Sequence, residues 1–253
     1  MTAEADPFAC SAPVRVRFDE AAPDGCLRTS SLLRYAQDLA WFHSAERGFT
    51  RAWYAERGLV WLARAAEVTV LAPIRVGEVM TGTTRVVGAR RVWARRRTTF
   101  TRSDDELAAW THVDWVLLDA RGAPTRIPAE FDGPFGIGQA DLALARVDLE
   151  APPSTADIAT FSVRPQELDP MDHANNAVYA DWLDERIQAC GGEAGLAATR
   201  AIPRRARLEY ARAAGRGAAV GAATWPDTHG TGWSCRLTDS AGDDLLRARL
   251  EPG

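Results

Sequence analysis

The chain has 253 residues, of which 46% are hydrophobic and 25% charged, the composition of a globular protein with one large domain or two of ordinary size. Its formal net charge of −4 at pH 7 argues against general nucleic-acid binding, which usually needs a basic domain. No apolar run approaches the length that spans a bilayer, and Met1 to Pro13 lack the basic start and apolar centre of a secretory signal, so we expect a cytoplasmic protein.

The first half of the sequence predicts one helix followed by four strands. Thr29 or Ser30 can cap the helix, because a side-chain hydroxyl can accept from the free N–H groups of a first turn. Residues of one face then recur at helical spacing, at Leu32, Leu33, Ala36, Leu39, Ala40 and His43. We expect His43, on this stripe, to be a core or pocket residue. The strands are predicted at Leu59–Val70, Glu78–Val87, Val92–Arg102 and Leu107–Leu118.

A stretch rich in proline and glycine separates the two halves. It runs from Pro124 to Pro153 and includes the glycine-rich residues 133–138. Breakers on this scale mark a linker or a long surface connection. We therefore place a boundary between residues 140 and 156, with an N-terminal domain over residues 1–145 and a C-terminal domain over residues 155–253.

The second half repeats the order of a helix and then strands. Asn175 or Asn176 can cap a helix whose apolar face carries Val178, Tyr179, Trp182, Leu183 and Ile187. Strands are predicted at Arg205–Arg212, Ala218–Trp225, Gly232–Thr238 and Leu245–Leu250. One long helix followed by antiparallel strands, present twice, predicts an α+β fold with two related domains.

The two halves also align directly with each other. Residues from Val16 onward match residues from Val163 onward without a gap, at a shift of 163 − 16 = 147 positions. The identical pairs are Val16 and Val163, Arg17 and Arg164, Glu20 and Glu167, and Pro23 and Pro170. A similarity of this length indicates a duplicated unit and not a solenoid of short repeats.

One polar cluster in the second half has the composition of a hydrolytic site. Asp169, His173, Asn175 and Asn176 lie on a predicted turn that opens a helix. A thioester carbonyl placed at a helix N-terminus would be polarised, and its developing oxyanion would be stabilised. Asp169 could attack that carbonyl or activate a water, while His173 and an asparagine orient the groups. The alternative is that the Asp and Asn side chains only cap the helix and the histidine fills a partly buried gap.

The first half of the chain helps to choose between these interpretations. At the same shift, Asp169 aligns with Ala22, His173 with Cys26 and Asn175 with Arg28. If capping were the whole purpose of the polar residues, both copies would need them equally. The asymmetry therefore indicates one active copy and one structural or substrate-holding copy.

The segment from Asp169 to Tyr179 resembles the D-x-x-x-H-x-N-N-x-x-Y segment of hot-dog-fold acyl thioesterases. Further motifs, in their order along the chain, are similar to the double-hot-dog acyl-acyl-carrier-protein (acyl-ACP) thioesterases of plants and bacteria. These motifs are Gly58-Leu-Val-Trp-Leu62, Trp115-Val-Leu-Leu-Asp119, Thr125-Arg-Ile-Pro128, and Leu208-Glu-Tyr210 with Arg212 and Gly215. The resemblance covers residues 14 to 250 and implies two tandem hot-dog domains, each a long helix packed on an antiparallel sheet.

The resemblance also implies an activity and a different role for each domain. The expected reaction is hydrolysis of a fatty acyl-ACP or acyl-CoA to a free fatty acid and the carrier thiol. The N-terminal domain would hold the acyl chain and the C-terminal domain would carry the catalytic residues. By position, Asp169 and His173 match the family's catalytic Asp and His, and Asn175 and Asn176 match its paired asparagines.

The chain departs from the plant pattern at two places. Met171 stands where that pattern has Asn between the Asp and the His, and Ala213-Ala214 stands where it has Glu-Cys. A simpler mechanism centred on Asp169 fits better, like that of single-hot-dog CoA thioesterases with an aspartate at this place.

We also expect four residues to contact the substrate. Ala177 and Tyr179 follow the polar cluster at the start of the helix, and Arg204 and Arg205 precede a predicted strand. Guanidinium groups pair well with carboxylates and phosphates, so these arginines are candidates to bind the acidic surface of a carrier protein or the phosphates of a pantetheine thioester.

A second group of arginines could also bind a carrier protein or these phosphates, but exposure to solvent is the preferred interpretation. Arg90 and Arg91, together with Arg95 to Arg97, are expected on solvated strand faces.

No metal or redox cofactor is expected, because the four cysteines and four histidines have no metal-ligand spacing. The expected partner is an acyl carrier protein or a CoA thioester, without membrane insertion, and the protein would be a monomer or a homodimer. Three alternatives remain: a housekeeping acyl-CoA thioesterase, a non-catalytic acyl-binding or carrier-binding hot-dog protein, and a hot-dog dehydratase, although dehydratases usually need a different arrangement of His and acid.

Overall fold

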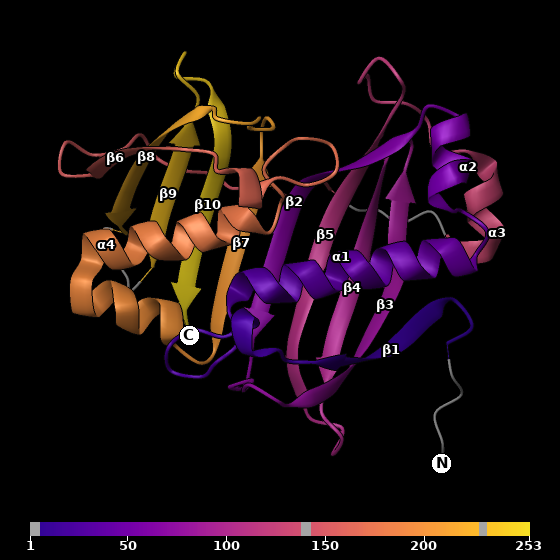
Figure 1. Cartoon of the computed structure of the whole chain (residues 1–253), viewed down its shortest axis with the longest axis horizontal. Helices are drawn as coiled ribbons and strands as arrows, with labels where there is room; N and C mark the ends of the chain where they lie inside the picture. Colours follow the sequence, from indigo (N-terminus) through magenta and orange to yellow (C-terminus); the bar gives the residue numbers. More distant parts are fainter. Residues whose placement is uncertain (1–5, 138–142, 228–231) are drawn as a thin grey trace. The chain divides into compact units, whose positions relative to one another are not determined.

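The computed structural model describes residues 6–137, 143–227 and 232–253 (Figure 1). Its contacts divide the chain into two compact units, in which short segments of the first half belong with the second. Unit 1 comprises Met1–Leu27, Arg34–Arg64 and Ile74–Leu144, and unit 2 comprises Arg28–Leu33, Ala65–Pro73 and Ala145–Gly253. The long helix of the first half and one strand therefore contribute residues to both units.

Unit 1 is built on an antiparallel sheet with the strand order β1-β3-β4-β5. The strands are β1 (Ala9–Arg15), β3 (Val79–Arg90), β4 (Trp93–Thr101) and β5 (Leu107–Leu118). Helix α1 (Thr29–Glu46) packs on β3 and β4: a Cβ on Gly82 would lie 2.6 Å from Leu39 Cδ1, and the Tyr35 and Phe100 rings are 6.2 Å apart. The smaller elements are η1 (Phe18–Glu20), α2 (Arg51–Glu56), η2 (Ala129–Phe131) and α3 (Asp132–Phe135).

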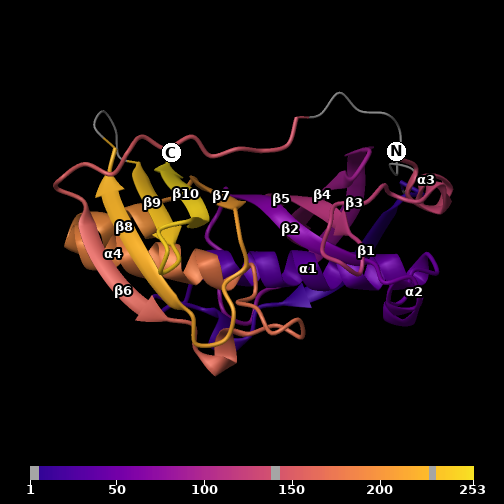
Figure 2. The same ribbon diagram turned by 90° about the horizontal axis from the view of Figure 1, so that it is seen from above.

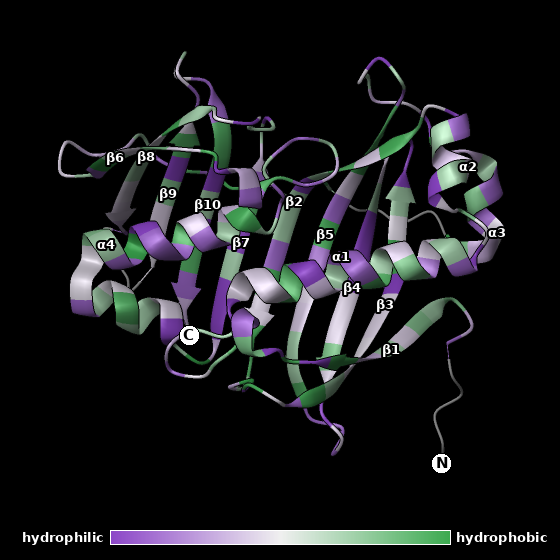
Figure 3. Cartoon of the chain, in the orientation of Figure 1, coloured by the Kyte–Doolittle hydropathy of each residue, from purple (hydrophilic) through white to green (hydrophobic). Residues whose placement is uncertain are grey.

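Unit 2 repeats this plan. Its antiparallel sheet has the order β2-β7-β10-β9-β8-β6, and α4 packs on β7, β8, β9 and β10 (Figure 2). The elements are β2 (Val60–Val70), β6 (Asp157–Ser162), η3 (Pro165–Glu167), α4 (Val178–Arg200), β7 (Arg204–Tyr210), β8 (Ala219–Pro226), β9 (Trp233–Thr238) and β10 (Asp244–Pro252). Residues Ala65–Val70 of β2 pair with Arg204–Glu209 of β7. Hydrophobic and hydrophilic residues alternate along α1 and α4, as expected for helices with one face on a sheet (Figure 3).

The duplication seen in the sequence extends to side-chain contacts. Each copy contains a short 3₁₀ helix, η1 or η3, that ends on a glutamate at equivalent positions. Glu20 accepts a hydrogen bond from Tyr35 Oη in α1, and Glu167 accepts one from Trp182 Nε1 in α4 at 3.2 Å. The two aromatic donors are also 147 positions apart, so the structure supports the gapless alignment of the halves.

The predicted elements compare well with the observed ones. All eight predicted strands are confirmed within a few residues, as is the α+β class. The sequence did not predict β1 or β6, which lie at the ends of the strand orders of the two units. The expected asparagine cap of the second helix is wrong: α4 has Ala177 at its N-cap without a side-chain cap, because Asn175 Oδ1 accepts from the Ala177 N–H and closes a turn before the helix.

Helix α4 contains a sharp turn that depends on glycine. Gly192 adopts φ 53° and ψ −125°, outside the helical region, so the chain folds back on itself within the helix. Gly195 then lies so close to the preceding turn that a Cβ there would be 2.1 Å from the Ile187 carbonyl oxygen.

We expect Gly195→Ala to lower the free energy of unfolding by roughly 1–3 kcal/mol, because backbone atoms must move to admit the methyl group. Gly133→Ala is the control, since no atom lies within 4 Å of a Cβ at that position. Urea denaturation of both variants measures the difference. Equal stability of the two variants would contradict the close approach at Gly195.

Among the described residues, no helix has the length and apolar character needed to cross a membrane.

Candidate functional site

The polar cluster of the second half forms a tight turn between Leu168 and Ala174, which pair as an isolated β-bridge. The Asp169 N–H donates to the His173 carbonyl at 2.8 Å, and the Asp172 N–H donates to the Asp169 carbonyl at 3.0 Å. Asp169 Oδ1 accepts from the Met171 N–H at 2.8 Å. Asp172 has φ 62°, a left-handed conformation that this turn requires. Backbone hydrogen bonds therefore fix the Asp169 carboxylate on a rigid loop.

The equivalent turn in unit 1 has the same backbone without the carboxylate. Its ends, Ala21 and Leu27, form the matching bridge, and the Ala22 N–H donates to the Cys26 carbonyl at 2.8 Å. Gly25, with φ 77°, stands at the position of Asp172. Because Ala22 occupies the position of Asp169 and the turn still forms, the carboxylate is not needed to build it. This observation favours a chemical role for Asp169 over a purely structural one.

Three polar atoms at this turn are left without a partner. Asp169 is half-buried, and its Oδ2 makes no hydrogen bond to any described residue. His173 Nδ1 and Asn176 Nδ2 are buried, and neither has a hydrogen-bond partner within the described parts of the chain. Buried polar groups are nearly always hydrogen-bonded, and each exception calls for an explanation. A bound substrate or water at this turn would supply the missing partners.

Two buried tyrosines form hydrogen bonds with backbone groups around the turn. Tyr179 Oη accepts from the Ala214 N–H at 3.1 Å, and Tyr210 Oη donates to the Asn176 carbonyl at 2.9 Å. Burial raises the pKa of Tyr179 to about 12, and the nearby charge of Asp169 contributes to this rise. Tyr179 is therefore a neutral phenol within electrostatic range of the carboxylate.

The start of α4 completes this region. Ala177 is 0% exposed and precedes the first helical residue, Val178, whose N–H donates to the Asn175 carbonyl at 2.9 Å. The positive end of the helix dipole therefore follows directly after the turn.

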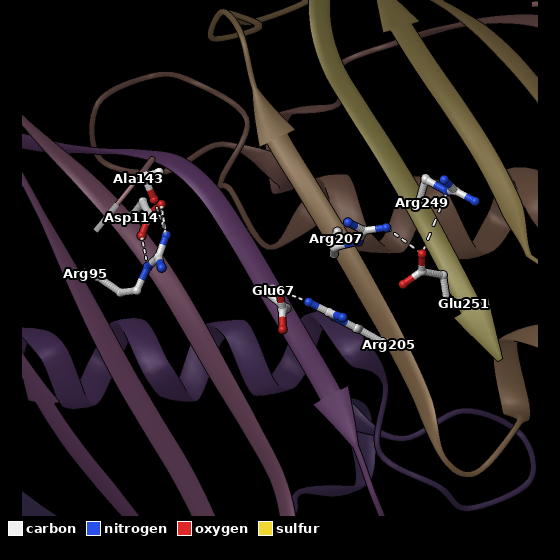
Figure 4. A network of polar contacts seen from close by, with 8 residues as sticks. All are labelled: Glu67, Arg95, Asp114, Ala143, Arg205, Arg207, Arg249 and Glu251. Atoms are coloured by element: carbon white, nitrogen blue, oxygen red, sulfur yellow. Dashed lines mark hydrogen bonds and ion pairs between the residues drawn. The ribbon is translucent and has the colours of Figure 1, made fainter. Parts of the chain in front are cut away.

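The two arginines expected to bind the carrier lie elsewhere. Tyr210, at the end of β7, contacts the turn, whereas Arg204 and Arg205 are at the other end of the strand, roughly 20 Å away at the usual rise per residue. Arg204 is buried and donates to the Ala201 carbonyl at 3.3 Å. Arg205 forms an ion pair with Glu67 at 2.6 Å, visible in Figure 4, and this contact raises its pKa. The structure thus brings Asp169, the asparagines and Tyr179 together but does not bring the arginines to them.

Unit 1 contains a large apolar pocket. Its wall is mainly aromatic and includes Trp41, Tyr54, Trp61, Trp115, Phe131 and Phe135. The phenylalanines belong to a tightly packed group, with the Phe49 and Phe131 rings stacked 4.1 Å apart. A pocket of this composition suits a hydrocarbon chain.

One polar residue of this pocket was not predicted correctly. The sequence suggested that Arg95, Arg96 and Arg97 all lie on solvated strand faces, but Arg96 lines the apolar pocket. Alternate residues of a strand point to opposite faces, so Arg96 shares the face of Ala94 and Phe100, both buried. The alternation of residues between the two faces of this strand could have predicted the inward position of Arg96 from the sequence.

His43 is fully buried beside this pocket, as expected. Its Nδ1 is 2.8 Å from Arg96 Nη1, and its Nε2 is 3.3 Å from Arg47 Nε. Arginine only donates, and a protonated imidazole has no lone pair to accept. Burial, followed by the charges of Arg96 and Arg47, lowers the pKa of His43 to about 4.

This environment predicts a loss of stability on acidification. Because the pKa is lower in the folded chain than the usual 6.5, the unfolded chain binds a proton first as the pH falls. The neutral His43 makes its full contribution to the free energy of unfolding above pH 6.5. This contribution is lost between pH 6.5 and 4, and the loss reaches about 2–3 kcal/mol by pH 4.5. Urea denaturation at pH 7.5 and 4.5 gives the free energy of unfolding of the wild-type protein and of a His43→Gln variant, which has no imidazole to titrate. The difference between their pH dependences is the contribution of His43. An identical pH dependence in both proteins would contradict the assignment.

Within the residues that the structure describes, no group of three or more His, Cys, Asp or Glu side chains could hold a metal ion. The chemistry available at the Asp169 turn is that of a carboxylate, an imidazole, two carboxamides and a helix N-terminus.

Comparison with known proteins identifies the fold and the family. A protein from Lactobacillus plantarum assigned as an oleoyl thioesterase superimposes with a TM-score of 0.85 at 19% identity, covering 97% of this chain and 96% of that one. An acyl-ACP thioesterase from Bacteroides thetaiotaomicron VPI-5482 gives 0.81 at 15% identity, covering 96% and 97%. The 12:0-ACP thioesterase from Umbellularia californica gives 0.80 at 20% identity, covering 98% of both chains. No curated protein sequence matches this chain.

The duplicated helix-on-sheet units and these structural matches confirm the expected hot-dog fold, and the class of protein is a thioester hydrolase. Residues 11–134 match the N-terminal domain of acyl-ACP thioesterases, and residues 150–251 match the C-terminal domain. The chain belongs to the acyl-ACP thioesterase family.

Proposed function

We propose that this chain hydrolyses fatty acyl-ACP to a free fatty acid and the carrier thiol, with the Asp169 carboxylate as the essential group. The observation that carries the proposal is the pair of equivalent turns, of which only the one in unit 2 has a carboxylate at this position. The unpartnered atoms of Asp169, His173 and Asn176 support a substrate at this turn.

Two roles fit the Asp169 carboxylate. As a general base, it takes a proton from a water whose oxygen attacks the thioester carbonyl, and the carrier thiolate leaves as the carbonyl re-forms. As a nucleophile, it attacks the carbonyl itself and expels the carrier thiolate, which leaves a mixed anhydride that water then hydrolyses. In both cases water is the second substrate, and the start of α4 stabilises the negative charge on the carbonyl oxygen.

His173 and the two asparagines would position the reacting groups. His173 Nδ1 and Asn176 Nδ2 have no hydrogen-bond partner among the described residues but are buried, so they would contact substrate or water only after neighbouring side chains move, whereas Asn175 Oδ1 is engaged with the Ala177 N–H at 2.9 Å. Asn175 would therefore act by shaping the backbone of the site. Tyr179, beside the carboxylate, would contact the acyl thioester together with Ala177.

The aromatic pocket of unit 1 would hold the acyl chain, because its lining is largely apolar. The carrier would be an acyl carrier protein acting in the cytoplasm, with Arg205 as the candidate docking residue, because Arg204 is buried. Since Arg205 is already paired with Glu67, docking through it would require the carrier to compete with that ion pair. The protein would be a monomer or a homodimer.

Free-thiol release from matched acyl-ACP and acyl-CoA substrates tests the proposal. We expect release from both carriers, with higher kcat/KM for acyl-ACP. Higher kcat/KM for acyl-CoA would favour a housekeeping acyl-CoA thioesterase. Measurable acyl binding without release from either carrier would instead identify a non-catalytic acyl-binding protein.

A further inference from the structure

The apolar pocket of unit 1 contains a cation that has no counter-charge among the residues that the structure describes. Arg96 lines the pocket from β4, among the aromatic side chains. Burial lowers the pKa of Arg96 to about 10, although the group stays protonated at neutral pH. Its neighbours along the strand have defined partners: Arg95 pairs with Asp114 at 2.6 Å, and Arg97 lies 5.7 Å from the Trp110 ring.

Arg96 makes one hydrogen bond and one ring contact with the described residues, and the neutral side chains of Tyr54 and Cys10 also lie within electrostatic range of its charge. Its Nη1 donates to His43 Nδ1 at 2.8 Å, and its guanidinium carbon lies 5.7 Å from the centre of the Phe135 ring. His43 is neutral and carries no negative charge. Among the described residues, no carboxylate forms a hydrogen bond or an ion pair with Arg96. The positive charge is therefore uncompensated inside the pocket.

The remaining donors of Arg96 are available to a ligand. A guanidinium group has five N–H donors, and the contact with His43 uses one. The other nitrogens have no hydrogen-bond partner among the described residues, and the side chain is partly exposed. Because Arg96 lines the pocket, a ligand bound there would contact this side chain.

The chemistry of the chain end decides whether this arrangement is favourable. A plain hydrocarbon end would displace water from the guanidinium and leave its donors unpaired, which costs free energy. A carboxylate or hydroxyl oxygen would accept charge-assisted hydrogen bonds from the same donors. The aromatic walls bind the methylene chain in both cases.

We propose that the unit 1 pocket selects acyl groups that carry an oxygen acceptor, a carboxylate or a hydroxyl, at the end remote from the thioester, with Arg96 as the specificity-determining residue. The inference rests on the proposed function in one respect, that the pocket holds the acyl chain. Its rival is a purely structural role, in which Arg96 only links His43 to β4.

Hydrolysis of three substrates with the same chain length provides the first test. These are decanoyl-CoA, 10-hydroxydecanoyl-CoA and the CoA monothioester of decanedioic acid. We expect kcat/KM to be roughly ten- to hundredfold higher for one or both oxygen-bearing substrates than for decanoyl-CoA. Comparison of the hydroxyl and carboxylate substrates shows which oxygen group the site prefers. Equal values, or a preference for decanoyl-CoA, would overturn the proposal.

Substitutions assign the preference to Arg96. Arg96→Met should abolish it, mainly through KM, whereas Arg96→Lys should retain part of it because the charge remains. Arg97→Met is the matched control, since that exposed side chain lies on the opposite face of β4, and it should keep the wild-type ranking. A ranking unchanged in Arg96→Met would show that another group sets the specificity. If Arg96→Met fails to fold, the order of the three kcat/KM values in the wild-type protein and in Arg96→Lys still tests the proposal.

Equilibrium binding separates this inference from the proposed activity. Quenching of tryptophan fluorescence by decanoic acid, decan-1-ol and decane requires no hydrolysis, and Trp41, Trp61 and Trp115 line the pocket. We expect the wild-type protein to bind decanoate, decan-1-ol or both at least about tenfold more tightly than decane, which has no acceptor, and Arg96→Met to lose this preference. If no thioester is hydrolysed but this preference holds, the proposed activity fails and the acceptor site stands. If thioesters are hydrolysed but the preference is absent, the acceptor site fails alone.

Discussion

Asp169→Asn is expected to reduce thioester hydrolysis by roughly 10²- to 10⁴-fold or more, the contribution typical of a positioned acid or base. A carboxamide has no basic oxygen to take a proton from water and is a poor nucleophile. The fold should survive, because Asn Oδ1 can still accept from the Met171 N–H as Asp169 Oδ1 does at 2.8 Å. The aligned turn of unit 1 forms with Ala22 at this position, which also indicates that the backbone does not need the charge.

Asp172→Asn is the matched control for this experiment. Asp172 lies in the same turn, is exposed, and pairs with Arg216 on the surface. Asparagine tolerates the left-handed φ of 62° at this position. The same chemical change three residues away should therefore leave kcat/KM near the wild-type value. Similar losses in both variants would indicate that the total charge of the turn matters and not the Asp169 carboxylate.

Asp114→Ala is expected to lower the free energy of unfolding by about 3–5 kcal/mol, the usual cost of breaking a buried ion pair from one side. Asp114 is 1% exposed, and both its oxygens accept from Arg95, at 2.6 and 2.7 Å (Figure 4). The two residues are directly opposite each other on β4 and β5. Removing the carboxylate breaks this ion pair from one side and takes two charge-assisted hydrogen bonds from the Arg95 guanidinium, whose side chain is only 17% exposed.

The exposed pair between Arg212 and Asp243 provides the comparison, because both side chains are more than half exposed. Asp243→Ala should cost less than about 1 kcal/mol, as is usual for surface ion pairs. Urea denaturation of the two variants measures the contrast. If Asp114→Ala costs no more than Asp243→Ala, burial does not make the Arg95 pair important. A double substitution, Arg95→Met with Asp114→Leu, should recover part of the loss by removing the unpaired charge.

Most of the fold could be predicted because hydrophobic spacing and turn residues determine strands and helices locally. The eight strands and both helices could be located in this way, and the internal duplication aligned Asp169 with Ala22. Strands β1 and β6 were missed because each lies at the end of its strand order, and β6 alternates only between partly buried and exposed positions. Such a strand is specified by its pairing partner more than by its own sequence.

The candidate site was predictable only in part, for a related reason. Asp169, His173 and the asparagines are close in sequence, so one turn was sufficient to bring them together. Arg96 is distant in sequence from His43 and Phe135, and its place in the pocket depends on how α1, β4 and α3 pack. Three adjacent arginines suggest a solvent-exposed segment unless it is known on which face of the strand each residue lies. The uncompensated charge therefore arises from tertiary packing, which the local pattern does not show.

The most direct test of the assignment of Asp169 is a chain-length scan of acyl-ACP and acyl-CoA substrates on wild-type protein and Asp169→Asn, with released thiol as the readout. We predict that the wild-type protein releases thiol with a maximum at a defined chain length, set by the finite pocket of unit 1. Asp169→Asn should remain folded and release almost none at any length. Thiol release by Asp169→Asn at the wild-type rate would contradict the assignment of Asp169 as the essential group.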